Sequence, residues 1–293
     1  MKTLFIYNPL SGHMQIKSKL WDIINELSAA YDLSVHATTC QKDAYNYVLE
    51  KGRHFDKIIC SGGDGTLSEV VNGLMSIEED KRPLLGFIPS GSTNDYAVSH
   101  HIPKNMIQAA KNIIMEDAVS VDVGLFNSLY FNYVAAFGIF TEVTYTTPQQ
   151  SKNILGHLAY ILGGIKSLAS IKKYKISFQI GEEEIEGKFI LGMISNSTSI
   201  GGIRNIKANE VDLNDGILEL FLIKAPKNAL ELTSIINYLT GIEKNSPLII
   251  YRKITQLKGT SKERVPWTRD GEFGGDHMNF EISVAAQAIK LTK

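Results

Sequence analysis

The strongest constraint on the fold is the alternation of short apolar segments with amphipathic ones over the first third of the chain. Residues 3–9 (TLFIYNP) and 57–63 (KIICSGG) have the length and apolar content of strands, whereas residues 14–30 carry apolar side chains at helical spacing. Strands that alternate with helices form mainly parallel sheets with helices on both faces. We therefore expect residues 1–122 to form one α/β domain.

The remainder, residues 123–293, has a different pattern. Segments with strand-like alternation follow one another, separated by turns, and one helix is expected near residues 228–240. The charged stretch at 180–187 (IGEEEIEG) is typical of an exposed hairpin tip between two strands. We expect a second, antiparallel β-rich domain, and whether its last strand returns to the first domain stays open.

Composition limits the partners and the compartment. The 293 residues include 30 basic and 31 acidic ones, so the net charge of −1 argues against extended binding to nucleic acid and allows only a local basic patch. Cys40 and Cys60 are the only cysteines, which is typical of reduced intracellular thiols. The start of the chain lacks the apolar core of a signal peptide, and no apolar run reaches the roughly 20 residues of a membrane span. We expect a cytoplasmic protein.

The stretch CSGGDGTLSEVVNGL places three glycines where an expected strand turns into a helix. Gly62, Gly63 and Gly65 allow a ligand to approach the backbone, and the amides at the start of a helix attract anions, so this turn suits a phosphate group. The Asp64 carboxylate, expected at an exposed turn, would repel that phosphate unless a cation such as Mg²⁺ lay between them. The alternative is a tight turn without a ligand, in which Asp64 or Thr66 caps the helix.

Two further turns have similar chemistry. NPLSG ends the first expected strand and PSGSTND ends another, and both combine glycine with hydroxyl side chains. Because the carboxyl ends of parallel strands meet at one edge of a sheet, we expect these turns and GGDGT to converge on one ligand site. Their spacing matches neither the P-loop nor the dinucleotide-binding fingerprint, so neither mechanism can be transferred unaltered.

Two acidic motifs lie in the second half. RDGEFGG offers Asp270 and Glu272 between glycines; a hairpin turn explains Asp270 and Gly271, whereas a phosphate site would give a carboxylate here the role of a general base. VDLNDGILEL carries Asp212 and Asp215, which fit a turn before a strand or, with a backbone carbonyl, an oxygen-rich Mg²⁺ site. Each motif has a structural and a functional interpretation.

The order of the motifs GGDGT, PSGSTND, LNDG and RDGEFGG, together with YTTPQQSKNILGHLAYILGGIKSL, resembles the bacterial soluble diacylglycerol kinase family over essentially the full chain. The catalytic domain of that family is also found in sphingosine kinases and resembles, more distantly, NAD kinase and phosphofructokinase. The resemblance implies an α/β domain of this type, a C-terminal β-sandwich domain and a cleft between them. It also implies a lipid kinase that uses ATP and Mg²⁺ to phosphorylate a diacylglycerol-like hydroxyl, giving a phosphatidate-like product.

The resemblance also assigns roles to residues. The base that takes the proton of the lipid hydroxyl would be Glu272, with Asp64 and Asp270 as further catalytic carboxylates. A Mg²⁺ ion would be held by the carboxylate of Asp215 together with the main-chain carbonyls of Asp212 and Ile217. Nucleotide contacts carry over by motif to Asn8, Pro9, Leu10, Ser11, Gly12, Thr38, Gly62, Gly63, Asp64, Gly65, Thr66, Leu67, Ser68, Ser92, Asn94 and Asp95.

Three positions depart from the family pattern. Ser68 stands where the family usually has Asn, Ser92 where it has Thr, and His13 where a Lys commonly follows SG. Ser92 keeps the hydroxyl, Ser68 shortens a polar side chain, and His13 makes a charge near the phosphates dependent on pH. Nucleotide affinity is the property that these changes affect.

The segment 153–175 has apolar residues nearly all round its middle and lysines at both ends. It fits either a buried helix or an interfacial helix whose Lys172, Lys173 and Lys175 contact lipid headgroups. The expected partners are a diacylglycerol-like lipid, the membrane surface as a peripheral contact and a second copy of the chain in a homodimer, but no nucleic acid. Two alternatives stay open: a kinase of a soluble small molecule, and a nucleotide-binding regulator without turnover.

Overall fold

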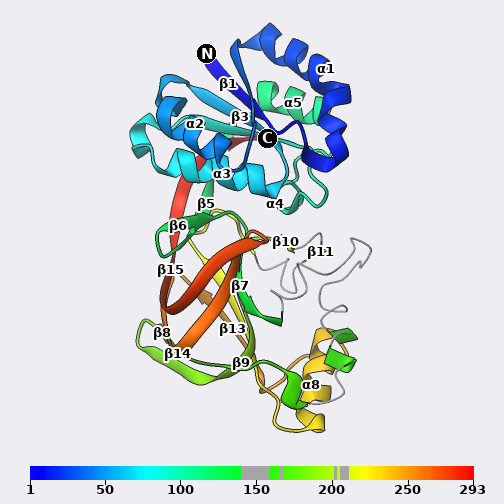
Figure 1. Cartoon of the computed structure of the whole chain (residues 1–293), viewed down its shortest axis with the longest axis vertical. Helices are drawn as coiled ribbons and strands as arrows, with labels where there is room; N and C mark the ends of the chain where they lie inside the picture. Colours follow the sequence, from blue (N-terminus) through cyan, green and yellow to red (C-terminus); the bar gives the residue numbers. More distant parts are fainter. Residues whose placement is uncertain (140–158, 161, 165–167, 201–202, 205–210) are drawn as a thin grey trace.

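The computed structural model describes residues 1–139, 159–160, 162–164, 168–200, 203–204 and 211–293. Most of its strands belong to one 13-stranded sheet, and a small two-stranded sheet accompanies it. Figure 1 shows an upper part that carries most of the helices and a lower part made mostly of strands, joined by the long C-terminal strand.

The upper part is an α/β unit with a mainly parallel sheet, as expected for the first third of the chain. Its strands run in the order β2-β1-β3-β4, all parallel, and the end of β15 continues the sheet parallel to β4. The strands are β1 (Lys2–Tyr7), β2 (Asp32–Ala37), β3 (Lys57–Gly62), β4 (Leu84–Pro89) and β15 (Glu272–Thr292). The helices are α1 (Gln15–Ala30), α2 (Asp43–Lys51), α3 (Asp64–Met75), α4 (Asp95–Ser99) and α5 (Met106–Met115).

The helices cover both faces of this sheet. Right-handed crossovers place α1 on one face and α2 and α3 on the other. In the structure α1 packs with α5, and α2 packs with α3 (Figure 1). Strand β3 lies between them and is buried along its whole length, whereas the edge strand β2 is partly exposed. Because the strands are parallel, the turns that follow β1, β2, β3 and β4 meet at one edge of the sheet.

The lower part is antiparallel, as expected for the second half. Its strands are β5 (Ala118–Phe126), β6 (Leu129–Phe131), β7 (Val134–Gly138), β8 (Tyr174–Ile180), β9 (Glu183–Ser195), β12 (Leu218–Lys224), β13 (Ile249–Ile254) and β14 (Gln256–Arg269), with the small pair β10 (Ser199–Ile200) and β11 (Ile203–Arg204) and the helix α8 (Ala229–Leu239). The charged hairpin tip lies between β8 and β9, as its sequence indicates. Strands β14 and β15 form a second hairpin, whose turn contains Asp270 and Gly271, both with positive φ.

The core of the lower part is built around Trp267 of β14. Its side chain is fully buried, and its ring centroid lies 4.9 Å from those of Phe126 and Phe137 and 4.7 Å from that of Phe280. Such a dense aromatic cluster resists displacement, because aromatic side chains bury a large apolar area. The β14–β15 hairpin is therefore held rigidly up to the turn that precedes Glu272.

Strand β15 connects the two parts. Its first half pairs with β14, and its second half pairs with β5 and, at the end, with β4. The Arg82 guanidinium holds this crossing: Nε donates to the carbonyl of Leu74 and Nη2 to that of Ile77, both over 3.1 Å, while Nη1 donates to the carbonyl of Ala288 in β15. One side chain thus ties the C-terminal end of α3 to the returning strand.

Replacing Arg82 with methionine should lower the free energy of unfolding by about 2 to 4 kcal/mol, because three main-chain carbonyls lose a charged donor. Chemical denaturation of the two proteins measures the difference. Arg53→Met is the matched control, since Arg53 is exposed. A loss at Arg82 no larger than about 0.5 kcal/mol, the usual scale for surface substitutions, would contradict this role.

Candidate active site

Three turns lie together at the carboxyl edge of the parallel strands. The side-chain amide of Asn8, after β1, donates to Thr66 Oγ1 in the first turn of α3 over 3.2 Å, and Ser11 Oγ donates to a main-chain carbonyl of the turn after β4 over 3.1 Å. A Cβ atom at Gly91 would lie only 2.4 Å from the Cα of Gly63. The turns after β3 and β4 can approach this closely only because glycine has no side chain.

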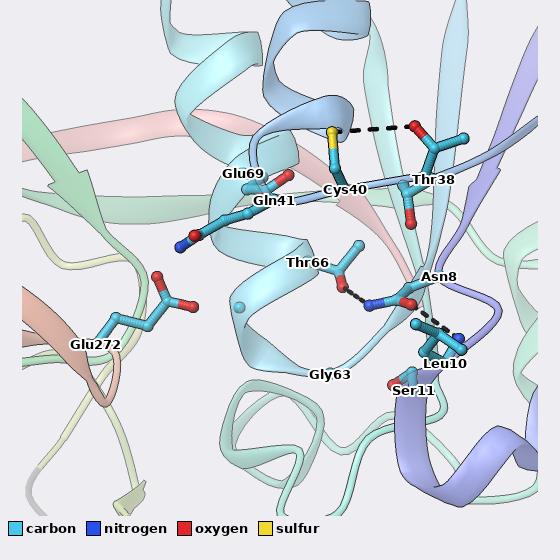
Figure 2. Close-up of a pocket in the computed structure, with 12 residues that line it drawn as sticks. Asn8, Leu10, Ser11, Thr38, Cys40, Gln41, Gly63, Thr66, Glu69 and Glu272 are labelled. Atoms are coloured by element: carbon cyan, nitrogen blue, oxygen red, sulfur yellow. Dashed lines mark hydrogen bonds between the residues drawn. The ribbon is translucent and has the colours of Figure 1, made fainter.

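A cavity of about 440 Å³ opens beside these turns (Figure 2). Its wall comes from the ends of β1, β2 and β3, from α3, and from the β14–β15 turn of the lower part. The lining residues are Asn8, Leu10, Ser11, Thr38, Thr39, Cys40, Gln41, Gly63, Gly65, Thr66, Glu69 and Glu272. The structure thus brings together seven of the expected nucleotide contacts, namely Asn8, Leu10, Ser11, Thr38, Gly63, Gly65 and Thr66, with the expected base.

The other expected nucleotide contacts lie in the same turns but outside the cavity lining: Pro9, Gly12, Gly62, Asp64, Leu67, Ser68, Ser92, Asn94 and Asp95. Ser92 is exposed at the turn after β4. The Asn94 side chain forms two hydrogen bonds with the backbone of Gly91, of 2.8 and 2.9 Å, and Asp95 Oδ1 accepts a 2.7 Å bond from Ser199 Oγ in the lower part. Asn94 and Asp95 therefore shape the site rather than face its cavity.

The first turn of α3 offers free backbone donors to the cavity. Its N-cap residue is Gly63, and no side chain of the described residues caps this helix. The alternative in which Asp64 or Thr66 caps the helix is therefore wrong: both lie inside the first turn, and Thr66 accepts its bond from Asn8. Uncapped amides with the partial positive charge of a helix start suit a phosphate group.

Glu272 brings a carboxylate from the lower part to this helix start. Its Oε1 lies 2.8 Å from the position that a Cβ atom at Gly65 would occupy. Figure 2 shows the Glu272 side chain directed from its turn toward the start of α3 across the cavity. A side chain at position 65 would crowd the tip of Glu272, which would then have to move away from the start of α3.

Asp64 is buried, which corrects the expectation that it lies at an exposed turn. Its side chain is 9% exposed and accepts hydrogen bonds from the backbone of Asp95 and Tyr96, at 3.2 and 3.3 Å, and from Thr93 Oγ1 at 3.2 Å. Burial raises the pKa of Asp64, while these hydrogen bonds oppose the shift. The carboxylate holds the start of α4 against the start of α3, because the first amides of α4 need an acceptor.

Asp270 points into the protein and not into the cavity. Its carboxylate accepts four hydrogen bonds of 2.8 to 3.2 Å, from the backbone of Asn132, Tyr133 and Val134 and from the side chain of Asn132. Burial raises its pKa to about 6. This carboxylate anchors the turn from which Glu272 extends, and its position matches the hairpin interpretation of the motif.

The raised pKa of Asp270 predicts a pH effect on activity. Protonation of the carboxyl group near pH 6 places an O–H group among four N–H donors and loosens the turn that carries Glu272. We expect kcat/KM of the wild type to fall on the acid side with an apparent pKa near 6. Asp270→Asn mimics the neutral group, so this variant should have a low kcat/KM at every pH, and its pH profile should not show the acid-side fall near pH 6. If the variant kept the same acid-side fall in kcat/KM, that fall would belong to another titrating group.

The raised pKa of Asp270 also predicts how stability depends on pH, with a sign opposite to that of activity. The pKa of Asp270 in the folded chain lies above its ordinary value of 3.8, so the folded state binds the proton more tightly. Its contribution to stability is therefore present below pH 3.8 and is lost as the pH rises toward 6. Activity and this contribution to stability should change in opposite directions over this range, which thermal denaturation of wild type and Asp270→Asn can test.

Several carboxylates act on the buried side chain of Tyr133. The phenol of Tyr133 is buried, and its pKa is raised by burial and then by the charges of Asp64, Asp270, Asp95 and Glu272. Two of these carboxylates come from the upper part and two from the β14–β15 turn. Backbone N–H groups donate to two of these carboxylates, Asp64 and Asp270. Sequence reasoning missed Tyr133, because no motif marks it.

The expected metal ligands lie elsewhere. Asp212, Asp215 and Ile217 belong to the segment before β12, and none of them lines the cavity. Asp215 Oδ1 accepts a 3.0 Å bond from the amide of Ile217, and the carboxylate of Asp122 accepts bonds from the amides of Gly216 and Gln287. Within the described part of the chain, no three His, Cys, Asp or Glu side chains are grouped as metal ligands.

Asp122 is a residue of this second region that sequence reasoning missed. Burial raises its pKa, and the charges of Asp215 and Asp212 add to the shift. The amide of Asp122 also donates to the carbonyl of Leu213 over 3.0 Å. The acidic segment before β12 is thus tied to β5, and its oxygen-rich chemistry suits Mg²⁺ more than a softer metal.

The sequence analysis predicted only one residue, Thr38, of the cavity wall that follows β2. Asp43 fixes this wall by accepting 2.7 Å bonds from the amide and hydroxyl of Thr39 and by bonding to His36 Nε2 over 2.8 Å. From the other side, Glu69 of α3 accepts a 2.7 Å bond from the amide of Lys42. Thr39 to Gln41 follow a parallel strand, so the rule that ligands bind at the carboxyl edge could have identified them.

Much of the segment 153–175 lies outside the described residues, including 153–158. Within the described part, Leu168–Ser170 form a 3-10 helix and Lys175 lies on β8, so the helix interpretation is wrong for Lys175 because its neighbours alternate as in a strand. Lys175 is paired with Glu186 over 3.0 Å, and Lys172 lies over the ring of Tyr174. No described helix is both long and apolar enough to cross a bilayer.

Two family models match this chain. The diacylglycerol kinase catalytic domain matches residues 2–126, and the YegS C-terminal NAD kinase beta sandwich-like domain matches residues 134–293. The fold is therefore that of kinases with an α/β catalytic domain followed by a β-sandwich, which confirms the expected fold class. The chain belongs to the diacylglycerol kinase family, as the motif order indicated.

Individual relatives agree with this assignment. A diacylglycerol kinase of Bacillus subtilis (strain 168) is 37% identical over 273 residues, covering 92% of this chain and 89% of that protein. One from Staphylococcus haemolyticus is 34% identical over 274 residues, covering 92% and 82%. The crystal structure of a putative diacylglycerol kinase from Bacillus anthracis has a TM-score of 0.83 at 26% identity, covering 99% and 97%. An Archaeoglobus fulgidus NAD kinase in complex with ATP shares the fold, with a TM-score of 0.54 at 12% identity and coverage of 99% and 93%.

Proposed function

We propose that this chain is a lipid kinase that uses ATP and Mg²⁺ to phosphorylate the hydroxyl of diacylglycerol or a similar lipid, giving phosphatidate. Membership of the diacylglycerol kinase family supports the reaction class. The observation that carries the proposal is the position of the Glu272 carboxylate, which faces the glycine-rich turn at Gly65 across the cavity. A carboxylate opposite a phosphate-binding turn is what general-base catalysis of phosphoryl transfer requires.

The nucleotide would bind along the carboxyl edge of the parallel strands. Its phosphates would meet the uncapped amides at the start of α3, beside the paired Asn8 and Thr66 side chains. The adenine ring of the nucleotide would lie between the turn after β1 and the wall after β2, where Leu10 of the β1 turn is 67% exposed and offers an apolar surface. The wall itself is held by Asp43 and Glu69, so the site is formed before the ligand binds.

The residues present fit a divalent cation. Glu272 lines the cavity and Asp64 lies in the turn beside it, next to the place assigned to the phosphates, so a cation there would reduce the repulsion between these carboxylates and the phosphates. Asp64 is the residue that would hold the nucleotide's Mg²⁺, and Asp215 with the carbonyls of Asp212 and Ile217 would hold a second ion outside the cavity. Mg²⁺ would supply charge neutralisation of the transferring phosphoryl group.

In the transfer step, the lipid hydroxyl would enter between Glu272 and the start of α3. Glu272 would accept the hydroxyl proton as the lipid oxygen bonds to the γ-phosphorus and the bond from this phosphorus to ADP breaks, with ADP leaving. Asp270 would keep the turn of Glu272 in place through its bonds to residues 132–134. The backbone amides of α3 would bind the negative charge that develops on the phosphoryl oxygens.

We further propose that the enzyme acts in the cytoplasm at a membrane surface. Its substrate would reside in a bilayer, and Lys172 and Lys175 are exposed on the lower part, where they could contact anionic headgroups. Because Lys175 also pairs with Glu186, Lys172 is the better placed of the two for this contact.

A panel of acceptors tests the proposal. The purified chain is incubated with γ-labelled ATP and Mg²⁺ in mixed micelles containing diacylglycerol, a sphingoid base or no lipid, and separately with NAD. We expect label in the diacylglycerol product and none in the others. Label in NAD without detergent would favour a kinase of a soluble molecule, and bound but intact ATP would favour a regulator without turnover.

A further inference from the structure

The main chain of Tyr130 in β6 joins the two parts of the molecule at one point. The side-chain amide of Asn72 in α3 donates to the carbonyl of Tyr130 over 3.1 Å, and the amide of Tyr130 donates back to Asn72 Oδ1 over 2.9 Å. Arg269 Nη1, at the end of β14, donates to the same carbonyl over 2.9 Å. A single peptide group thus receives a side chain from the nucleotide-binding helix and a side chain from the hairpin that carries Glu272.

The geometry of Asn72 is well fixed. Its Nδ2 also donates to the carbonyl of Ser68, one turn earlier in α3, over 2.8 Å. Both hydrogens of the amide and its oxygen are therefore used, so the side chain cannot rotate without losing at least one bond. Asn72 lies two turns after the glycine-rich turn on the same rigid helix, and its position follows that of the turn.

Arg269 is placed equally close to the reacting groups. It is the last residue of β14 and precedes Asp270, which anchors the turn of Glu272. Its guanidinium is partly buried, and burial lowers its pKa while the charges of Asp270 and Glu272 oppose the shift. Burying a guanidinium is costly unless its N–H groups form hydrogen bonds. One of these groups donates to the carbonyl of Tyr130, which lies outside the glycine-rich turn and outside the RDGEFGG motif.

We propose that Asn72 and Arg269 are positioning residues that set the distance between Glu272 and the start of α3 through their shared contact on Tyr130. The inference rests on the proposed function, in which Glu272 and the turn at Gly65 act on one reaction. The path from one to the other is short: α3, the peptide group of Tyr130, and the end of β14. Displacing a catalytic group by about 1 Å costs about 100-fold in rate, so this contact should govern turnover and not nucleotide affinity.

A second contact supports the cleft from the side of α4. Ser99 of α4 bonds to Ser197 over 2.7 Å, and Asp95 accepts a bond from Ser199 over the same distance. These hydroxyl contacts involve α4 and residues 197–199, and not β14. The contact at Tyr130 differs from them because it includes Arg269, the last residue of the strand that leads into the turn of Glu272.

The test is a double-mutant cycle with Asn72→Ala, Arg269→Met and the double variant. Each single variant should lower kcat by about tenfold or more while the KM for ATP changes less than about twofold. Because both side chains act through one carbonyl, the double variant should be hardly slower than the worse single variant. Arg269→Lys keeps a donor and the charge, so it should recover part of the loss.

Two controls separate positioning from general damage. Asn25→Ala changes an exposed asparagine of α1, and Arg264→Met changes an exposed arginine of β14. Both should leave kcat and the KM for ATP at wild-type values. Melting temperatures of all variants show whether a loss of kcat simply follows a loss of folded protein, which would overturn the proposal.

The pH profile separates positioning from a purely electrostatic role of Arg269. If Arg269 acted only through its charge, Arg269→Met would shift the acid limb of kcat/KM and Asn72→Ala would have no effect, and the proposal would fail. Multiplied losses in the double variant would overturn it as well. A wild-type chain that phosphorylates no lipid would instead refute the proposed function, and the two failures are thereby distinguished.

Discussion

Glu272→Gln should lower turnover by about 100-fold or more while ATP binds with wild-type affinity, because the amide keeps the size of the side chain and removes its proton-accepting site. The Glu272 carboxylate reaches the Gly65 turn, so this substitution acts directly at the proposed site of transfer. Steady-state kinetics and a direct titration with ATP measure the two quantities separately.

The matched control for this variant is Glu281→Gln, an exposed glutamate later in β15 that pairs with Lys258 at the surface. It should have wild-type kinetics. If the turnover of Glu272→Gln stayed within a few-fold of wild type, Glu272 would not be the base. If its ATP affinity fell together with its rate, the carboxylate would act on the nucleotide or its metal ion instead.

Asp64→Ala should remove activity and also lower stability, by about 1 to 3 kcal/mol. The buried carboxylate holds the backbone of Asp95 and Tyr96 and the hydroxyl of Thr93, and alanine leaves these donors without an acceptor. The loss of rate should be at least about 100-fold, because the start of α4 and the proposed metal ligand change together. Activity assays and thermal denaturation test the two effects.

Asp64→Asn distinguishes the two contributions. The amide keeps one oxygen for the donors of α4 but lacks the charge that a metal ion needs, so this variant should recover stability more than activity. Asp22→Ala, at an exposed position of α1, is the control for loss of an aspartate. Near-normal turnover of Asp64→Ala with Mg²⁺ would contradict the assignment of this turn to the phosphates.

The architecture could be predicted from the sequence because the information is local. Alternation of strands and helices over the first third determines a parallel sheet, and a parallel sheet brings the turns after β1, β3 and β4 to one edge whatever their order. The convergence of Asn8, Gly63 and Thr66 at one cavity follows from that rule. Thr39 to Gln41 obey it too and could have been included.

Other features depend on partners that are distant in the sequence. Asp64 is buried by the start of α4, about thirty positions later, and Asp270 is bound by the amides of residues 132–134, more than 130 positions earlier. No local pattern indicates which carboxylate of a glycine-rich motif faces inward. The joint of Asn72 with Tyr130 and the acidic surroundings of Tyr133 likewise exist only after the two parts have packed together.

The most direct test of the central claim, that ATP and a lipid hydroxyl react in one cleft, is the stoichiometry of the reaction. ADP and phosphatidate are measured in the same samples, with diacylglycerol in mixed micelles and Mg²⁺ present. The account predicts that the two products form mole for mole, and that both rates fall together in Glu272→Gln. ADP formed without phosphatidate, or at a rate that Glu272→Gln leaves unchanged, would contradict it.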